Sequence, residues 1–272
     1  MAQLHPQIRD VLKVTAEAGL RPIEEMTPTE AREQMEATAR ARKAEPLPVA
    51  KIEERLFPGP GGMTRMRLYW PHQSAAPVPA IVYFHGGGHV IGSLDTHDFI
   101  ARNLCAGTGA MVASVDYRMG PEHKFPAAVD DCFAALRWVH ANAASLGADP
   151  DRIGVHGDSA GGNLAAVTAL LARDADGPQL RLQSLVYPVT DYGLAGDFDC
   201  SALCGLPKKE GVVHPSLSPA GQYTDTANLF HDYNDSRLCA TVQYRPRQFS
   251  FSDPVTSVSA TRGHPTRPTS CA

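Results

Sequence analysis

Two glycine-rich stretches decide the fold of this chain: HGGG at residues 85–88 and GDSAG at residues 157–161. The first follows the apolar run AIVYF at residues 80–84, and the second follows RIGVH at residues 152–156. Each stretch therefore ends a predicted strand, and open α/β sheets place their reactive groups at the carboxyl ends of their strands. A serine between two glycines at such a turn is typical of a nucleophile elbow, because the bend leaves no room for neighbouring side chains.

Both stretches also have simpler interpretations. A serine at the start of a helix often serves only as an N-cap, and a run of glycines often forms only a loop. The two stretches in this order, each behind a strand-like run, are far more specific than either one alone. They indicate Ser159 as the candidate nucleophile.

Strand-like and helical patterns alternate along the middle of the chain. After a predicted antiparallel hairpin, strand-like runs are separated by helical patterns near 96–106, near 126–144 and directly after Ser159. The hairpin comprises residues 49–57 and 63–70, and the later strands are expected at 80–84, 111–115, 153–156 and 182–187. This alternation predicts the α/β class, with a mostly parallel sheet and helices on both of its faces.

We expect the chain to divide into three parts. Residues 1–45 carry two helix-like segments that form an N-terminal helical cap, and residues 46–198 form the α/β core. Residues 199–272 are poorly patterned and rich in Ser, Thr and Pro, so we expect poor order there. A shifted reading frame, a mis-spliced exon or a truncated gene would produce the same loss of pattern. Our hypothesis is that this atypical segment is not the ancestral C-terminus.

The composition of the 272 residues excludes several classes of protein. A formal net charge of −4 offers no basic face for nucleic acid, and no apolar stretch approaches the roughly 18 residues of a membrane span. The first 20 residues lack the apolar centre of a signal peptide, so we expect a cytoplasmic location. None of the six cysteines has the spacing of a zinc site, and Cys105 and Cys132 fall in apolar helical patterns. The sequence makes no prediction of the oligomeric state.

Acyl transfer to a serine requires hydrogen-bond donors for the oxyanion that develops in the transition state. The backbone N–H of Ala160 directly follows Ser159 and is the expected first donor, while Gly87 and Gly88 are expected to supply the others. Glycine suits these positions because a β-carbon would hold the backbone away from the substrate.

Other polar residues near these motifs have mainly structural interpretations. We expect His85 to pack beneath the turn that it forms with Gly86, and His156 to be a hydrogen-bonded structural histidine. Asp158 either anchors the elbow by hydrogen bonds or only complements the positive end of the following helix. Asp131, with its acidic neighbour at position 130, is expected on a solvated helix face.

Over about residues 1–192 the sequence resembles the hormone-sensitive-lipase-like family of carboxylesterases, which has the α/β-hydrolase fold. The resemblance rests on the two glycine-rich stretches, extended to GDSAGG at 157–162, and on DYR at 116–118, PEHKFPAA at 121–128 and YP at 187–188. It implies a serine carboxylesterase that hydrolyses short-chain acyl esters through an acyl-enzyme intermediate. It also implies an oxyanion hole at the HGGG turn, a small-molecule ester as the partner, and no metal or cofactor.

The catalytic acid and base are the point at which the sequence departs from that family. Asp253, in an Asp-Pro pair, is a partial match to the acid, and the only histidine beyond it is His264. His231 and His214 precede Asp253 and would reverse the usual order of acid before base. Order alone does not exclude them, since a catalytic triad is defined by its geometry in space.

Two alternative functions remain open from the sequence. A chain of this fold without a working base can be a non-catalytic binding protein for a small molecule, as plant gibberellin receptors are. A truncated or frame-altered hydrolase would instead be inactive. Turnover of a simple ester that depends on Ser159 distinguishes the enzyme from both alternatives.

Overall fold

A computed structural model describes residues 4–41, 45–72 and 77–189. Two helices, α1 (Pro6–Glu17) and α2 (Pro28–Arg40), precede the hairpin of β1 (Lys51–Gly59) and β2 (Gly62–Trp70). Strands and helices then alternate: β3 (Val78–Phe84), α3 (Asp98–Thr108), β4 (Met111–Val115), α4 (Ala127–Asn142), β5 (Ala148–Asp158), α5 (Ala160–Asp174) and β6 (Leu180–Val186). Single 3₁₀ turns lie at Ile23–Glu25 and Ala144–Leu146. The predicted order of elements is confirmed.

The six strands form one mixed sheet in the order β1-β2-β4-β3-β5-β6. β2 pairs antiparallel with β1 and with β4, whereas the pairings β3–β4, β3–β5 and β5–β6 are parallel. Parallel strands need a crossover, which here is supplied by α3, α4 and α5 in turn. The mostly parallel sheet expected from the sequence is therefore confirmed.

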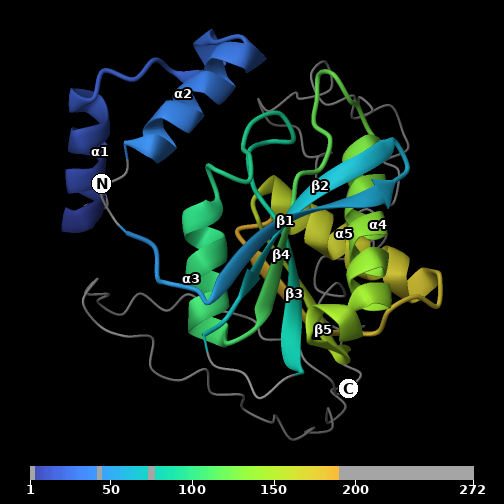
Figure 1. Cartoon of the computed structure of the whole chain (residues 1–272). Helices are drawn as coiled ribbons and strands as arrows, with labels where there is room; N and C mark the ends of the chain where they lie inside the picture. Colours follow the sequence, from blue (N-terminus) through green and yellow to red (C-terminus); the bar gives the residue numbers. More distant parts are fainter. Residues whose placement is uncertain (1–3, 42–44, 73–76, 190–272) are drawn as a thin grey trace, which may run out of the picture.

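Helices cover both faces of the sheet, with α3 on one face and α4 and α5 on the other (Figure 1). β3 shows how one strand serves both layers, because its side chains alternate between the faces. Val82 and Phe84 join the core under α4 and α5, whereas Ile81 and Tyr83 join the core under α3. Cys105 and Cys132 are buried free thiols, one in each of the two cores, as expected.

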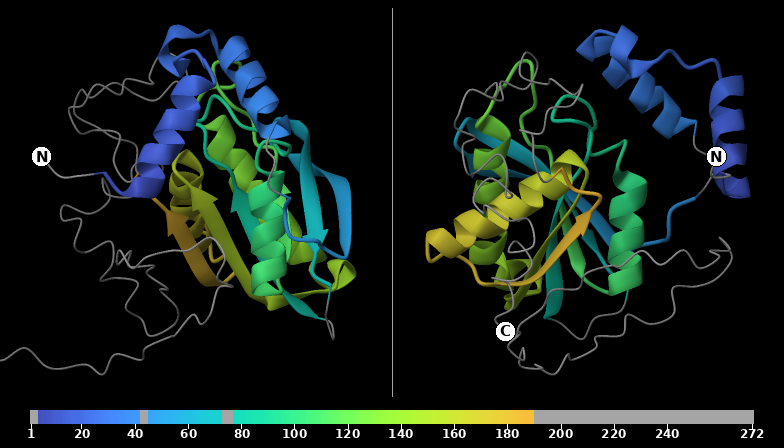
Figure 2. Two further views of the ribbon diagram at one scale, coloured as in Figure 1. Left: turned by 90° about the vertical axis from the view of Figure 1, so that its left-hand side faces the viewer. Right: turned by 180° about the vertical axis from the view of Figure 1, so that it is seen from behind.

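α1 and α2 lie together outside the sheet and its flanking helices (Figures 1 and 2). α1 buries no residue, and α2 buries only Ala31. α2 is nevertheless a well-built helix, since Thr27 and Glu30 form a reciprocal capping box at its N-terminus. The cap boundary at residue 45 and the core boundary at residue 198 stay predictions, and residues 199–272 lie outside the described residues.

The expectation that Asp131 is solvated is wrong. Its side chain is fully buried, and its carboxylate accepts hydrogen bonds from Nε and Nη2 of Arg118, both at 2.8 Å, and from the Arg118 backbone N–H at 3.0 Å. This pairing raises the pKa of Arg118. A buried carboxylate is tolerated only with such partners, so Asp131 is a structural anchor between α4 and the segment after β4.

No helix within residues 4–41, 45–72 and 77–189 has both the length and the apolar character needed to cross a lipid bilayer.

Candidate active site

Ser159 occupies a strained turn between β5 and α5. Its backbone has φ 54° and ψ −119°, a region that residues other than glycine rarely adopt. The turn is closed on both sides, because the Ser159 N–H donates to the carbonyl of Val186 at 2.9 Å and its own carbonyl accepts from the N–H of Asn163 at 3.1 Å. Its side chain makes no capping hydrogen bond with α5, which contradicts the simple N-cap interpretation.

Positions 157 and 161, on either side of Ser159, are restricted to glycine because backbone atoms fill the space that a β-carbon would occupy. A β-carbon on Gly157 would lie 2.1 Å from the carbonyl oxygen of Gly161, and one on Gly161 would lie 2.0 Å from the carbonyl oxygen of Phe84. Neither position admits any other residue without movement of the backbone. The elbow therefore presses directly against the end of β3, where the HGGG turn begins.

The HGGG turn is strained in the same way. Gly87, Gly88 and His89 all have positive φ, at 121°, 61° and 61°. The Gly87 carbonyl accepts hydrogen bonds from the N–H groups of Val90 at 3.0 Å and Ile91 at 2.9 Å, which fold the chain back on itself. Within the described part of the chain, the N–H groups of Gly87 and Gly88 donate no hydrogen bond.

The two turns are neighbours because β3 and β5 are adjacent parallel strands, in which Phe84 is the register partner of Gly157. Contact between the turns is close, since a β-carbon on Gly86 would lie 2.4 Å from Oδ2 of Asp158. Helix α5 begins at Ala160, and the first N–H groups of a helix have no partner within it. The fold thus places Ser159 and unpaired N–H donors together at the carboxyl ends of the adjacent strands β3 and β5.

Asp158 anchors the elbow. The buried carboxylate accepts a hydrogen bond from the hydroxyl of Tyr83 at 2.8 Å, across the β3–β5 pairing. Burial raises the pKa of Tyr83, and the nearby charge of Asp158 raises it further, so the phenol remains a donor at every ordinary pH. Of the two interpretations of Asp158, the structure favours the hydrogen-bonded anchor. Tyr83 could not be predicted as the partner of Asp158, because the local pattern shows only an aromatic residue in a strand.

His85 packs under the turn, as expected. It is fully buried, stacks on Tyr117 with ring centroids 4.5 Å apart, and its Nδ1 lies 2.7 Å from the carbonyl oxygen of Gly86. The Tyr117 hydroxyl donates to the His85 carbonyl at 2.6 Å. Burial lowers the pKa of His85 to about 3, so its imidazole is neutral. His156 is also structural, with Nδ1 2.9 Å from the hydroxyl oxygen of Ser184.

The candidates for the catalytic acid and base, Asp253, His264, His231 and His214, all lie outside the described residues. Among the residues that the structure describes, no histidine hydrogen-bonds to the Ser159 hydroxyl, and no group of His, Cys, Asp and Glu side chains could hold a metal ion. A cavity of about 440 Å³ lies between α2 and the segments that follow the HGGG turn and β4, and Ser159 is not among the residues that line it. Its lining includes Arg32, Glu36 and Ser93.

Comparisons with known proteins agree with this geometry. Residues 81–202 match the model of a family described as having the alpha/beta hydrolase fold. Carboxylesterase NlhH of Mycobacterium tuberculosis is 56% identical over 146 residues, which are 53% of this chain and 46% of that protein. Ethyl acetate hydrolase of Pseudomonas putida is 38% identical over 198 residues, 69% of this chain and 62% of that protein. The chain thus spans about half the length of the curated relatives that it matches.

Solved structures extend the comparison. The ester-hydrolase EH1AB1 from the metagenome of Lake Arreo superimposes with a TM-score of 0.71 at 33% identity, covering 80% of this chain and 75% of the other. A hyperthermophilic esterase from Pyrobaculum calidifontis gives a TM-score of 0.65 at 44% identity, covering 70% of this chain and 60% of the other. The matched residues 81–202 include both the HGGG turn and the elbow at Ser159, and the chain belongs to the α/β-hydrolase family, in its hormone-sensitive-lipase-like branch.

Proposed function

We propose that the protein is a serine carboxylesterase that hydrolyses short-chain acyl esters through an acyl-enzyme intermediate. The Ser159 hydroxyl attacks the ester carbonyl and forms a tetrahedral oxyanion, which collapses with loss of the alcohol. Water then attacks the acyl-serine and releases the acid. The partner that we propose for the protein is a small-molecule ester.

The backbone of Ser159 carries the proposal. A serine at φ 54° is strained and keeps this conformation only because the surrounding structure holds it there. Strain of this kind is most common at functional sites. Ser159 is half-buried in the described structure and its side chain does not cap α5, which supports a hydroxyl that is free to react with a substrate. A purely structural serine would need neither the strain nor the two crowded glycines beside it.

The oxyanion hole is proposed at the N–H groups of Gly87, Gly88 and Ala160. The first two donate to no described residue, and the third opens α5, whose positive dipole end favours a developing negative charge. Each such donor contributes on the order of 3 kcal/mol in a transition state. The arrangement needs no cofactor.

The general base and its acid partner are proposed among the four candidates beyond residue 189. A base that accepts the Ser159 proton is essential to this chemistry. The sequence offers Asp253 as the acid. Its candidates for the base are His264, His231 and His214. The names of the relatives, which include an ethyl acetate hydrolase and carboxylesterases, support an ester of small size as the substrate. We also propose a cytoplasmic location, which cell fractionation tests: the protein should be found in the cytoplasmic fraction.

Hydrolysis of p-nitrophenyl acetate and p-nitrophenyl butyrate by the full chain tests the proposal. We expect Ser159→Ala to lower kcat by at least about a thousandfold, because the members of a catalytic triad act as a unit. Ser145→Ala is the matched control, since this exposed serine bonds only to the carbonyl of Asn142 and should retain wild-type turnover.

Other outcomes favour the alternatives. Saturable binding of the ester without turnover by the folded wild-type chain would support the non-catalytic binding protein. A chain that aggregates and neither binds nor turns over ester would support the damaged hydrolase.

A further inference from the structure

The guanidinium of Arg32, on α2, contacts two segments of the core that are far away in the sequence. Its Nε donates to the carbonyl of Val90 at 2.7 Å, and its Nη2 donates to the carbonyl of Gly120 at 2.6 Å. Nη1 and Nη2 also form a bidentate pair with the carboxylate of Glu122, both at 2.8 Å. The forked geometry of arginine makes such simultaneous contacts possible.

The Val90 carbonyl belongs to the peptide that closes the HGGG turn. A peptide unit is planar, so the group that fixes the carbonyl of Val90 also fixes the N–H of Ile91. That N–H donates to the carbonyl of Gly87 at 2.9 Å. The Gly87 carbonyl in turn shares a peptide plane with the N–H of Gly88. Two hydrogen bonds and two planar peptide units therefore connect Arg32 to the N–H of Gly88, a proposed oxyanion donor.

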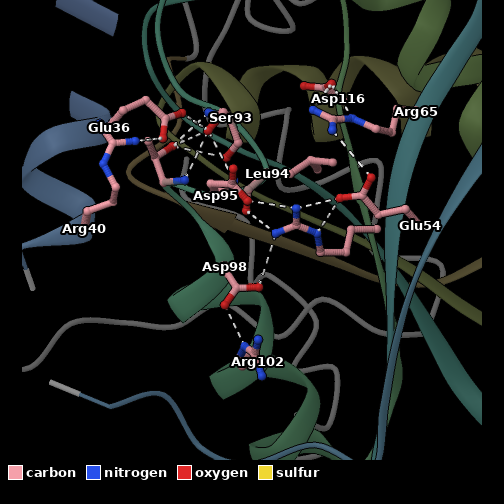
Figure 3. Close-up of polar contacts among 12 residues, drawn as sticks. Glu36, Arg40, Glu54, Arg65, Ser93, Leu94, Asp95, Asp98, Arg102 and Asp116 are labelled. Carbon is pink, nitrogen blue, oxygen red and sulfur yellow. Dashed lines mark hydrogen bonds and ion pairs between the residues drawn. The ribbon is translucent and has the colours of Figure 1, made fainter. Parts of the chain in front are cut away.

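Other contacts hold the same turn from the core and from α2. The N–H of Gly120 donates to the carbonyl of His89 at 2.8 Å, and Gly120 itself is held by Arg32. One helical turn beyond Arg32, Glu36 accepts a hydrogen bond from the Ser93 hydroxyl, in the segment that follows the turn (Figure 3). His89, a residue with a side chain at φ 61°, stays strained only where its neighbours leave no alternative.

We propose that Arg32 is a positioning residue for the oxyanion hole: through the Val90–Ile91 peptide, the cap helix α2 sets the direction of the Gly88 N–H. The proposal rests on the proposed function, because it assigns a role within the same reaction. This role differs from that of a residue that only joins α2 to the core by hydrogen bonds, which would stabilise the fold without changing the chemical step.

Substitutions at Arg32 test the role by kinetics. We expect Arg32→Gln to lower kcat for p-nitrophenyl butyrate by about tenfold or more, since a misdirected donor weakens the transition state more than the ground state, while KM changes by less than about threefold. Arg32→Lys keeps the positive charge but loses the forked guanidinium, so its kcat should lie between that of Arg32→Gln and that of the wild type.

Two further variants distinguish a role in positioning the Gly88 N–H from a role in stabilising the fold alone. Arg21→Gln is the matched control, because Arg21 contacts Glu30 and the carbonyl of Glu25 at the N-terminal end of the same helix and does not touch the turn. It should keep wild-type kcat and KM. Glu122→Gln removes the ion pair but leaves the two backbone contacts of Arg32, so its kcat should exceed that of Arg32→Gln.

Hydrogen exchange gives a readout that needs no turnover. The amide of Ile91 should exchange about tenfold faster or more in Arg32→Gln than in the wild type, because its peptide loses one of its two restraints, and Arg21→Gln should leave the rate unchanged. Equal losses of kcat in Arg32→Gln and Arg21→Gln, or wild-type exchange at Ile91 in Arg32→Gln, would overturn the proposal. If the wild-type chain shows no turnover that depends on Ser159, the proposed function fails, and the exchange rate alone decides the role of Arg32.

Discussion

Replacement of Gly87 by alanine should damage turnover far more than folding. The new β-carbon would lie 2.0 Å from the carbonyl oxygen of Ile91 and 2.7 Å from its carbonyl carbon, both backbone atoms that cannot rotate away. The φ of 121° adds strain of about 1–3 kcal/mol for a residue with a side chain. The turn must therefore shift, and the loss of one oxyanion donor lowers kcat by about 10²–10³.

The stability cost of the φ strain alone is modest by comparison. For a chain of this size, 1–3 kcal/mol corresponds to a fall in melting temperature of about 2–12 °C. Gly109→Ala is the matched control, since Gly109 also has positive φ, 67°, at the end of α3, with no atom within 4 Å of the new β-carbon. It should carry backbone strain but keep wild-type kcat. The reasoning is refuted if Gly87→Ala retains wild-type kcat, or if both variants lose kcat in proportion to their loss of stability.

Further predictions concern the buried charges and histidines. Asp131→Ala removes the carboxylate that accepts three hydrogen bonds from the partly exposed Arg118 and should lower the free energy of unfolding by about 1.5–3 kcal/mol in urea titrations, whereas a loss below about 1 kcal/mol would contradict the anchor. Burial lowers the pKa of His85 to about 3 and that of His89 to about 4, from an ordinary value of 6.5. The unfolded chain therefore binds more protons than the native state below pH 6.5, so stability is complete above that pH and is lost as the pH falls. Each histidine should contribute a loss of about 2 kcal/mol between pH 7 and pH 5, and a flat profile over this range would exclude neutral burial.

The fold of the core could be predicted because its strands are apolar runs that end at glycine-rich turns. β4 begins and ends where the sequence places it, at Met111 and Val115, since every residue in it is buried and the charged Asp116 follows it directly. β5 is longer than predicted: it begins at Ala148, five residues before Ile153. The added residues are mostly polar and exposed, and they extend the strand through pairing of Ala148 with Val78, which no local pattern reveals.

The geometry of the candidate site could be predicted where the reason for a residue is local, and could not be predicted where that reason lies far along the chain. The strained turns at Ser159 and Gly87 follow from their glycine-rich surroundings, because a cramped turn restricts which residues fit beside it, whereas the catalytic roles of both residues stay predictions. Asp131 could not, since its partner Arg118 is separated from it by a turn and by the start of α4. Arg32 was missed for the same reason: its contacts with Val90 and Glu122 bring together residues 58 and 90 positions apart.

Covalent labelling tests the central claim most directly. A fluorophosphonate forms a bond from phosphorus to the oxygen of an activated serine and releases fluoride, so peptide mapping by mass spectrometry identifies the nucleophile. The account predicts one adduct, on the peptide that contains Ser159, and none in Ser159→Ala. An adduct on a different serine, or no adduct on a folded chain that hydrolyses p-nitrophenyl butyrate, would contradict it.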